Sequence, residues 1–512
     1  MSSLKSILSS LPQNKAKIAI IIALLLTITA GAVLRLHNLS TQPYWMDEGY
    51  TINAVLSILE KGSSVLDSGE SYSCATYCYP TAYITKIFGN NAFSYRLFSA
   101  IAGIIFILII FIITTDLFNS RIALLSSFLV SFSYWQIAWS RQARWYTLFA
   151  VFFWLSLYFF YKALYDDKRK ILYICLAISF TILSALTHGL GYLIPFIFLI
   201  WAAIDQIFIK KLFSWQKTAL ATFLSAIIVL ILEKALHLNF IVPFFNNLRL
   251  SYDLPYYLSF YLRNYWPFII LSIIALFSAQ NKFKKESYFL IFALFVYLLP
   301  LSFLTNIVHY RYLFHVIPAL FILASIIIVQ TYQQITKNYQ KIILVLTGIA
   351  IFFTIGGGVI WPTNTYYLES DNPETLGERP HYAYTPQPNW NGAYAFIQTN
   401  KKKTDIVISS LPQFNKIFLG EAGYWIKYNY LGIKDKPNII ENNQEYYVGA
   451  KVINDLAELK QITKNSHGYI VFDYMAIDGR IPDGTVEYIN NTFKQVFYEK
   501  TNYYSQIWVY AF

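Results

Sequence analysis

Long apolar runs separated by short polar segments dominate the pattern of residues along this chain. The first run, residues 18–34 (IAIIIALLLTITAGAVL), follows three lysines. Further runs long enough to cross the roughly 30 Å hydrocarbon layer of a bilayer begin near Leu97, Ile122, Tyr146, Ile171, Gly189, Thr218, Tyr265, Ser287, Tyr312 and Ile342. The pattern therefore predicts about eleven transmembrane helices.

The first apolar run is similar to the core of a signal peptide, but two features favour a retained helix. The run is longer than the usual signal core, and Arg35 and Leu36 stand where a small-residue cleavage site is expected. We therefore predict that the N-terminus is cytoplasmic and that this helix stays in the chain.

Lysine-rich loops fall on one side of the predicted helices. These loops contain Lys168, Arg169 and Lys170; Lys210, Lys211 and Lys217; Lys282, Lys284 and Lys285; and Lys337 with Lys341. Because cytoplasmic loops carry an excess of positive charge, this alternation predicts a multi-pass protein of the cell membrane. An odd number of helices then places everything after Pro362 on the extracytoplasmic side.

The last part of the chain loses the long apolar runs. Residues 362–389 contain five prolines and no apolar period, which predicts a linker. Shorter patterns follow, and they predict helices over 392–400 and 485–499 and strands over 405–412, 468–475 and 505–512. We expect residues 390–512 to form an extracytoplasmic α/β domain of ordinary size. Acceptor recognition and simple covering of a cleft both remain open as its role.

Composition agrees with the membrane pattern. The 512 residues are 56% hydrophobic and 13% charged, against roughly 25% charged in soluble domains. The net charge of +12 does not indicate nucleic acid, because the lysines lie in short clusters between apolar runs. Three cysteines exclude a disulfide scaffold and a CxxC-type zinc framework. Cys74 and Cys78 lie in a predicted outer loop, where we predict a disulfide between them.

An Asp-Glu pair occurs in YWMDEGY, residues 44–50, within the first outer loop (37–95). Residues 50–62 then have helical apolar spacing but are too short to span a bilayer, and residues 79–91 have a similar pattern. Asp47 and Glu48 therefore lie at the start of a predicted surface helix, where the helix dipole favours anions. Taken alone, the pair is better explained as an ordinary helix cap than as a chemical site.

Arginine is distributed differently from lysine. Only Arg121 and Arg169 fall in predicted cytoplasmic loops, whereas the outer helix ends and outer loops hold Arg35, Arg96, Arg141, Arg144, Arg249, Arg263 and Arg311. A guanidinium group binds phosphate through two parallel hydrogen bonds, so this set predicts an anionic, phosphorylated ligand at the outer leaflet. Single members of the set are equally well explained as interfacial residues whose charged ends reach towards water.

Four segments in order resemble the GT-C superfamily of polyprenyl-phosphate-dependent glycosyltransferases, in the branch of protein O-mannosyltransferases and lipid A aminoarabinose transferases. The segments are YWMDEGY (44–50), NNAFSYRLFSAIAG (90–103), WSRQARWYTLF (139–149) and HYRYLFHVIPALFIL (309–323). The resemblance implies an α-helical polytopic membrane protein with a C-terminal extracytoplasmic α/β domain. It also implies a glycosyltransferase domain over residues 1–361 that includes the catalytic first outer loop.

The resemblance also implies roles for individual residues. Asp47 corresponds to the family's catalytic base, and Glu48 to the acid beside it. The residues that correspond to donor phosphate-binding positions are Arg96, Arg141, Arg144, Tyr146 and Arg311. The implied donor is a sugar on a polyprenyl monophosphate.

Chemical reasoning reaches a similar site independently. Neither a DxD metal motif nor a glycine-rich phosphate loop occurs in the short cytoplasmic loops, so a sugar donor used outside must arrive on a lipid. Transfer needs a base for the acceptor hydroxyl and cations for the leaving phosphate. We predict that Asp47 is the base. The cations are Arg141, Arg144 and Arg311. Arg141 and Arg144 are three residues apart and lie on one face if they are helical.

The sequence leaves several points open. A single displacement would invert the anomeric centre, and the acceptor is a protein, a lipid or a polysaccharide. His188 and His309 have no paired ligand spacing, so we predict no cofactor, although a divalent metal is not excluded. We expect membrane lipids, but no nucleic acid, as further partners.

A transporter or flippase of lipid-linked sugars, or a ligase of whole glycans, is the alternative function. The charges at outer helix ends and the lack of a visible repeat argue against a transporter.

Overall fold

The structure is a computed structural model. It describes residues 14–205, 252–278, 282–304, 309–364, 387–427, 443–474, 481–501 and 505–512, together with isolated positions between these ranges. The contacts divide the chain into two compact units. The membrane unit comprises Met1–Leu39, Ala75–Tyr77 and Arg96–Tyr366, and the sheet unit comprises Ser40–Cys74, Cys78–Tyr95 and Tyr367–Phe512.

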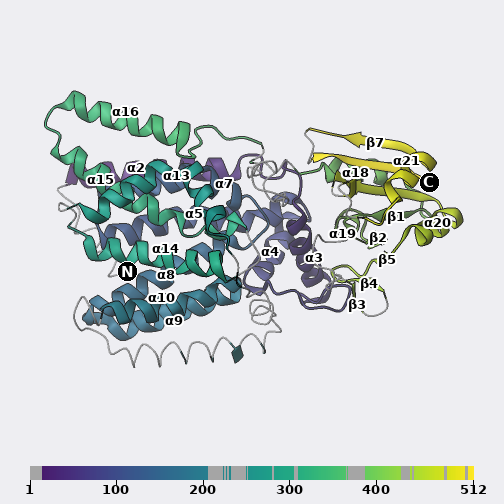
Figure 1. Cartoon of the computed structure of the whole chain (residues 1–512), viewed down its shortest axis with the longest axis horizontal. Helices are drawn as coiled ribbons and strands as arrows, with labels where there is room; N and C mark the ends of the chain where they lie inside the picture. The colour runs from purple at the N-terminus through teal and green to yellow at the C-terminus, as the bar shows by residue number, and fades with distance from the viewer. Residues whose placement is uncertain are drawn as a thin grey trace. The chain divides into compact units, whose positions relative to one another are not determined.

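The membrane unit is a bundle of apolar helices (Figure 1). In chain order they are α2 (Asn14–Leu36), α5 (Ala92–Leu117), α6 (Ser120–Phe132), α7 (Tyr134–Ser140), α8 (Tyr146–Tyr165), α9 (Lys170–Thr187), α10 (Ile194–Ile204), α13 (Leu254–Phe277), α14 (Lys284–Phe303), α15 (Ile317–Gln334) and α16 (Asn338–Ile355). Within the bundle α8 packs along α9, α6 contacts both α2 and α15, and α13 contacts α14 and α15.

Local sequence explains where several of these helices begin. The Asn119 side chain accepts the backbone N–H groups of Arg121 and Ile122 and so caps α6. Pro195 and Pro318 occupy the first turns of α10 and α15, where a missing N–H costs nothing. Apolar and aromatic side chains fill the bundle, as in the packing of Phe153 against Tyr297.

The helical architecture predicted from the apolar runs is confirmed. Eight described helices are long and apolar enough to cross a membrane, and residues 120–132 and 189–204 form shorter apolar helices. The run near Thr218 lies outside the described residues, so the count of eleven stays a prediction. The proposed linker falls largely on residues 367–386, which are also outside the described part of the chain.

The first outer loop contains two helices. Helix α3 (Met46–Lys61) begins at the acid pair and ends at Gly62, whose φ of 76° is the left-handed conformation that glycine adopts without strain. Helix α4 (Ala75–Phe88) follows, and a disulfide joins Cys74 to Cys78 across its first turn, with the two Cα atoms 5.4 Å apart. The predicted disulfide is therefore confirmed.

The sheet unit contains a mixed sheet. Its strands, within the described residues, are β1 (Ile406–Ser409), β2 (Tyr424–Ile426), β3 (Ile439–Ile440), β4 (Gln444–Glu445), β5 (Lys451–Ile453), β6 (Gly468–Asp473), β7 (Lys494–Glu499) and β8 (Ile507–Ala511). The order is β3-β4-β5-β2-β1-β6-β8-β7. The four strands from β5 to β6 in this order run parallel, and antiparallel pairs extend the sheet at both ends.

Four helices accompany the sheet: α18 (Trp390–Asn400), α19 (Pro412–Leu419), α20 (Leu456–Asn465) and α21 (Thr485–Thr492). The predicted α/β character is confirmed, but the single helix predicted over 485–499 is wrong. The helix ends at Thr492, and the rest of the segment forms β7, which pairs antiparallel with β8. A strand partner that follows in the chain cannot be read from local periodicity.

The sheet unit also contains most of the first outer loop, including α3. That residues 37–95 belong to the membrane domain stays a prediction, and the contacts group most of them with the C-terminal sheet. Apolar residues of α3, such as Ile52 and Val55, are fully buried, and α3 packs against α19 of the sheet unit. The carboxylate pair thus belongs to the same compact unit as the C-terminal sheet.

Candidate active site

The two acids of YWMDEGY occupy the first turn of α3. Trp45 is the N-cap residue, and the Glu48 carboxylate accepts its backbone N–H at 3.0 Å, which forms one half of a capping box. The Glu48 side chain is fully buried. Capping, the alternative considered for the pair, therefore accounts for Glu48.

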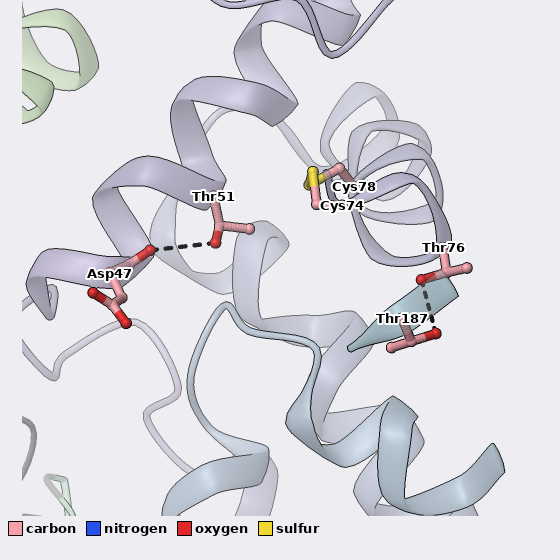
Figure 2. Close-up of a disulfide and its surroundings, with 6 residues drawn as sticks. All are labelled: Asp47, Thr51, Cys74, Thr76, Cys78 and Thr187. Carbon is pink, nitrogen blue, oxygen red and sulfur yellow. Dashed lines mark hydrogen bonds between the residues drawn. A yellow bond between two sulfur atoms is a disulfide. The ribbon is translucent and has the colours of Figure 1, made fainter. Parts of the chain in front are cut away.

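Asp47 is in a different situation. It is half-buried, and its main-chain oxygen accepts the Thr51 hydroxyl at 3.3 Å. Figure 2 shows the Asp47 carboxylate projecting from the first turn of α3, apart from this main-chain bond. The two acids thus differ in burial and in the hydrogen bonds that they make, although they are adjacent in the chain.

Two of the predicted phosphate-binding arginines bind backbone carbonyl groups. Nη1 of Arg141 donates to the carbonyls of Leu34, Arg35 and His37, and its Nη2 donates to those of Asn38 and Asn364, at 2.7 to 3.3 Å. The bonds to Leu34 and Arg35 satisfy carbonyl groups in the last turn of α2 that have no partner within the helix. Burial lowers the pKa of Arg141 to about 10, so the group stays cationic at neutral pH.

Arg96 has a similar environment, because its buried Nη1 donates to the carbonyl of Leu39 at 3.0 Å. The buried Arg35 likewise donates to the carbonyls of Gly31, Val130 and Ser131. Arg263 is exposed on α13, and Arg249 lies outside the described residues. The arginines grouped by sequence therefore do not share one environment.

Arg144 and Arg311 lie against aromatic rings. The Arg144 guanidinium is 3.9 Å from the centre of the Trp145 ring and 5.9 Å from that of Tyr146. The Arg311 guanidinium is 6.0 Å from the Tyr146 ring and 5.7 Å from the Tyr312 ring. Tyr146 therefore has both cations near its ring, an arrangement that cation–π attraction stabilises.

His188 completes this cluster, and sequence reasoning did not select it for the site. Its ring lies 5.5 Å from Tyr146 and 5.8 Å from Tyr312. Burial, followed by the positive charges of Arg144 and Arg311, lowers the pKa of His188 to about 3. The ring is therefore neutral at physiological pH. Because its Nδ1 accepts the N–H of Leu190 at 3.1 Å, Nε2 carries the proton and serves as a donor.

Arg141 and Arg144 do not lie on one helix, so that expectation is wrong. Helix α7 ends at Ser140 and α8 begins at Tyr146, with a non-helical turn between them. The turn directs Arg141 to the end of α2 and Arg144 to the aromatic cluster. Sequence spacing alone could not detect the break, because the segment has no proline or glycine to mark it.

Within the part of the chain that the structure describes, no group of three His, Cys, Asp or Glu side chains could hold a metal ion. The functional assignment of Asp47, Glu48, Arg96, Arg141, Arg144, Tyr146 and Arg311 stays a prediction. The structure divides these residues between the two units, with the two acids in the sheet unit and the other five in the membrane unit.

Comparison with known families gives a partial match. The model of the family described as dolichyl-phosphate-mannose-protein mannosyltransferase matches residues 76–232, which is less than half of the chain. No curated protein sequence matches the chain.

Solved structures are similar over nearly the whole chain. The apo form of ArnT from Cupriavidus metallidurans has a TM-score of 0.65 at 13% identity and covers 95% of this chain and 97% of its own. ArnT bound to undecaprenyl phosphate has a TM-score of 0.63 at 12% identity, with the same coverage of the two chains. The Archaeoglobus fulgidus oligosaccharyltransferase with zinc and sulfate has a TM-score of 0.56 at 14% identity, and the match covers 94% of this chain and 72% of that one.

These similarities establish the fold. The chain has an ArnT-like fold, with a helical membrane part and a C-terminal sheet. The family resemblance that four sequence segments predict is confirmed by the family-model match over residues 76–232, and the structural neighbours show the fold.

Proposed function

We propose that this protein is a membrane glycosyltransferase that moves a sugar from a polyprenyl-phosphate donor to an acceptor hydroxyl at the extracytoplasmic face. The observation that carries the proposal is the cluster of Arg144 and Arg311 around Tyr146 and the neutral His188. Two cations and a neutral N–H donor at the end of apolar helices suit a lipid-bound phosphate.

The neighbours support the class of donor. ArnT has been solved with undecaprenyl phosphate, and the A. fulgidus oligosaccharyltransferase AglB with a dolichol-phosphate and an inhibitory peptide. A polyprenyl phosphate is the chemistry that these ligands share. We assign the same class of leaving group to this chain, and leave the sugar and the acceptor unassigned.

In the proposed reaction Asp47 removes the proton of the acceptor hydroxyl as its oxygen attacks the anomeric carbon. The bond from that carbon to the phosphate oxygen breaks, and the polyprenyl phosphate leaves with the bonding electrons. Arg144 and Arg311 stabilise the charge that develops on this phosphate. The single displacement inverts the anomeric centre. Arg96 and Arg141 add positive charge and hold the main chain, and Glu48 holds the first turn of α3.

Two other functions were considered. A ligase of whole glycans would use the same groups with a larger donor, and the fold similarity to an oligosaccharyltransferase keeps this as the second candidate. A transporter or flippase is less well supported, because Arg144 and Arg311 lie outside the candidate membrane spans, at their ends.

The substitution Asp47→Asn tests the proposal directly. Asp47 follows the Trp45 N-cap and its side chain is only half-buried, so we expect an amide of the same shape to leave the fold intact, but an amide cannot accept the acceptor proton. We expect the transfer rate from a polyprenyl-phosphate sugar to fall by roughly 100-fold or more, with unchanged thermal stability. Near-normal turnover by a folded variant would remove Asp47 as the base.

A further inference from the structure

Helix α3 lies against α19, and both belong to the sheet unit. Asp47 is in the first turn of α3, while α19 follows strand β1 of the C-terminal sheet, more than 350 residues later in the chain. The contact between the two helices therefore joins the proposed base to the C-terminal domain.

Asn53 links the two helices by hydrogen bonds. Its Nδ2 donates to the carbonyl of Gly49 at 2.8 Å, in its own helix, and to the carbonyl of Gln413 at 3.0 Å, in α19. The side chain is buried, at 5% exposure. A buried amide bonded to both helices fixes their mutual register, because losing one bond leaves a buried polar group unsatisfied.

Gly49 allows the close approach. A Cβ atom at this position would lie 2.7 Å from Cγ of Gln413 and 3.3 Å from the ring of Phe414. The first distance is below any ordinary van der Waals contact, so an added methyl group requires either the Gln413 side chain or α3 to shift. Gly49 is two residues after Asp47, within the same turn of helix.

Contacts before, within and after α3 hold the first outer loop to the C-terminal domain. The Tyr44 ring stacks on Phe414 with centroids 6.4 Å apart. The Tyr50 ring stacks on Tyr447 at 3.8 Å. Asp67 forms an ion pair with Lys416 at 3.1 Å. Although burial opposes the shift, Lys61 and Lys416 together hold the pKa of this carboxyl below its usual range. The loop is thus attached at several points along its length.

We propose that α19 of the C-terminal domain positions the proposed base, with Gly49, Asn53 and Gln413 as positioning residues. This inference rests on the proposed function, because it gives a role to a domain that contains none of the other proposed catalytic groups. Gly49 and Asp47 lie in the same turn of α3, so a shift of Gly49 is expected to move Asp47 as well. A misplacement of about 1 Å in a reacting group can cost on the order of 100-fold in rate.

A double substitution tests the contact. Gly49→Ala adds the methyl group that would meet Cγ of Gln413, and Gln413→Ala removes that Cγ. Helix propensity favours alanine over glycine by roughly 1 kcal/mol, so a loss caused by Gly49→Ala cannot come from intrinsic weakening of the helix. Gly348→Ala in α16 is the matched control, since its added Cβ meets nothing within 4 Å.

Two measurements are made on the full-length protein in detergent or nanodiscs. For sugar transfer, we expect Gly49→Ala to lower kcat by about 10-fold or more with an unchanged KM for the polyprenyl-phosphate donor. Gln413→Ala alone causes a smaller loss, and the double variant recovers most of kcat. For hydrogen exchange of α3 amides, Gly49→Ala lowers protection and the double variant restores it.

The two measurements can contradict different parts of the proposal. If Gly49→Ala leaves the hydrogen exchange of α3 unchanged, the positioning contact is wrong whatever the activity. If exchange changes and recovers but kcat does not follow it, α19 does not position the base. If the wild-type protein transfers no sugar from any polyprenyl-phosphate donor, the proposed function is wrong, and with it the positioning role, even where exchange shows that the contact exists.

Discussion

Asp47 and Glu48 are neighbours in the chain, but the structure gives them different surroundings. Glu48 is fully buried and accepts the backbone N–H of Trp45, whereas Asp47 is half-buried at the start of α3. Arg141 and Arg144 show the same divergence over three residues, since one binds the carbonyls at the end of α2 and the other lies on Trp145. Residue type alone therefore does not determine which interactions a side chain makes.

Substitution of Glu48 separates capping from charge. Gln at this position can still accept the Trp45 backbone N–H, so we expect Glu48→Gln to retain thermal stability and to lose less transfer activity than Asp47→Asn. Glu48→Ala removes the acceptor and should cost about 1 kcal/mol of stability. Denaturant unfolding of the two variants measures this difference, and equal losses for Gln and Ala would contradict the capping role.

Lysine in place of each arginine distinguishes phosphate binding from carbonyl binding. Arg144→Lys keeps the charge but cannot make two parallel hydrogen bonds to phosphate, so we expect it to raise the transfer barrier by on the order of 2 to 4 kcal/mol, without loss of thermal stability. Arg141→Lys loses several carbonyl bonds and should lower the melting temperature as well as the transfer rate. If Arg144→Lys transfers sugar at the normal rate, Arg144 is an interfacial residue only.

At the scale of helices and strands, the sequence predicts what local patterns determine. Apolar runs placed the membrane helices, and the pattern after Asp47 predicted α3. The same reasoning failed where a distant partner decides the outcome, as for β7, which exists because β8 pairs with it. It also failed for the position of α3 against α19, because Gly49 and Asn53 have no local signature of a contact made 360 residues away.

Strand β4 carries a buried acid that makes the sheet unit sensitive to pH. Burial raises the pKa of Glu445 to about 7, although the N–H groups of Val448 and Tyr447 oppose the shift. In the unfolded chain the pKa is 4.5. The folded state therefore binds the proton more tightly, and its stability falls as the pH rises from about 4.5 to about 7 and is constant above that.

The substitution Glu445→Gln should remove this dependence. The shift corresponds to about 3 kcal/mol between the two ends of the range, and a neutral amide does not titrate. We expect the wild-type protein to melt at a higher temperature at pH 5 than at pH 8, and Glu445→Gln to reduce the difference. Thermal melts followed by tryptophan fluorescence at both pH values check the expectation, and an unchanged difference in the variant would assign it to other groups.

At the scale of the whole molecule, the proposed chemistry is divided between two compact units. The arginines and Tyr146 belong to the membrane unit, and Asp47 belongs to the sheet unit. Neither unit alone holds both the proposed base and the proposed phosphate-binding groups. Under the proposed function, we therefore expect transfer to require both units.

Transmembrane orientation is tested by labelling. In a Cys175→Ser background, which removes the free cysteine, we expect Lys403→Cys to react with an impermeant thiol reagent in intact cells and Lys284→Cys to react only after lysis. Both positions are exposed lysines, so access to the reagent is the only intended difference. The reverse pattern would place the C-terminal domain in the cytoplasm and remove the proposed extracytoplasmic site.

The contact between α3 and α19 has a consequence for biosynthesis. The ribosome produces Asn53 before it produces Gln413, and the two are separated by 360 residues. At 5 to 20 residues per second, α3 exists for roughly 20 to 70 seconds before its partner is made. During that interval the membrane helices already carry their arginines, while the helix with Asp47 has no fixed position. Under the proposed function, we therefore expect a nascent chain to begin transfer only after its last domain has been made and has folded.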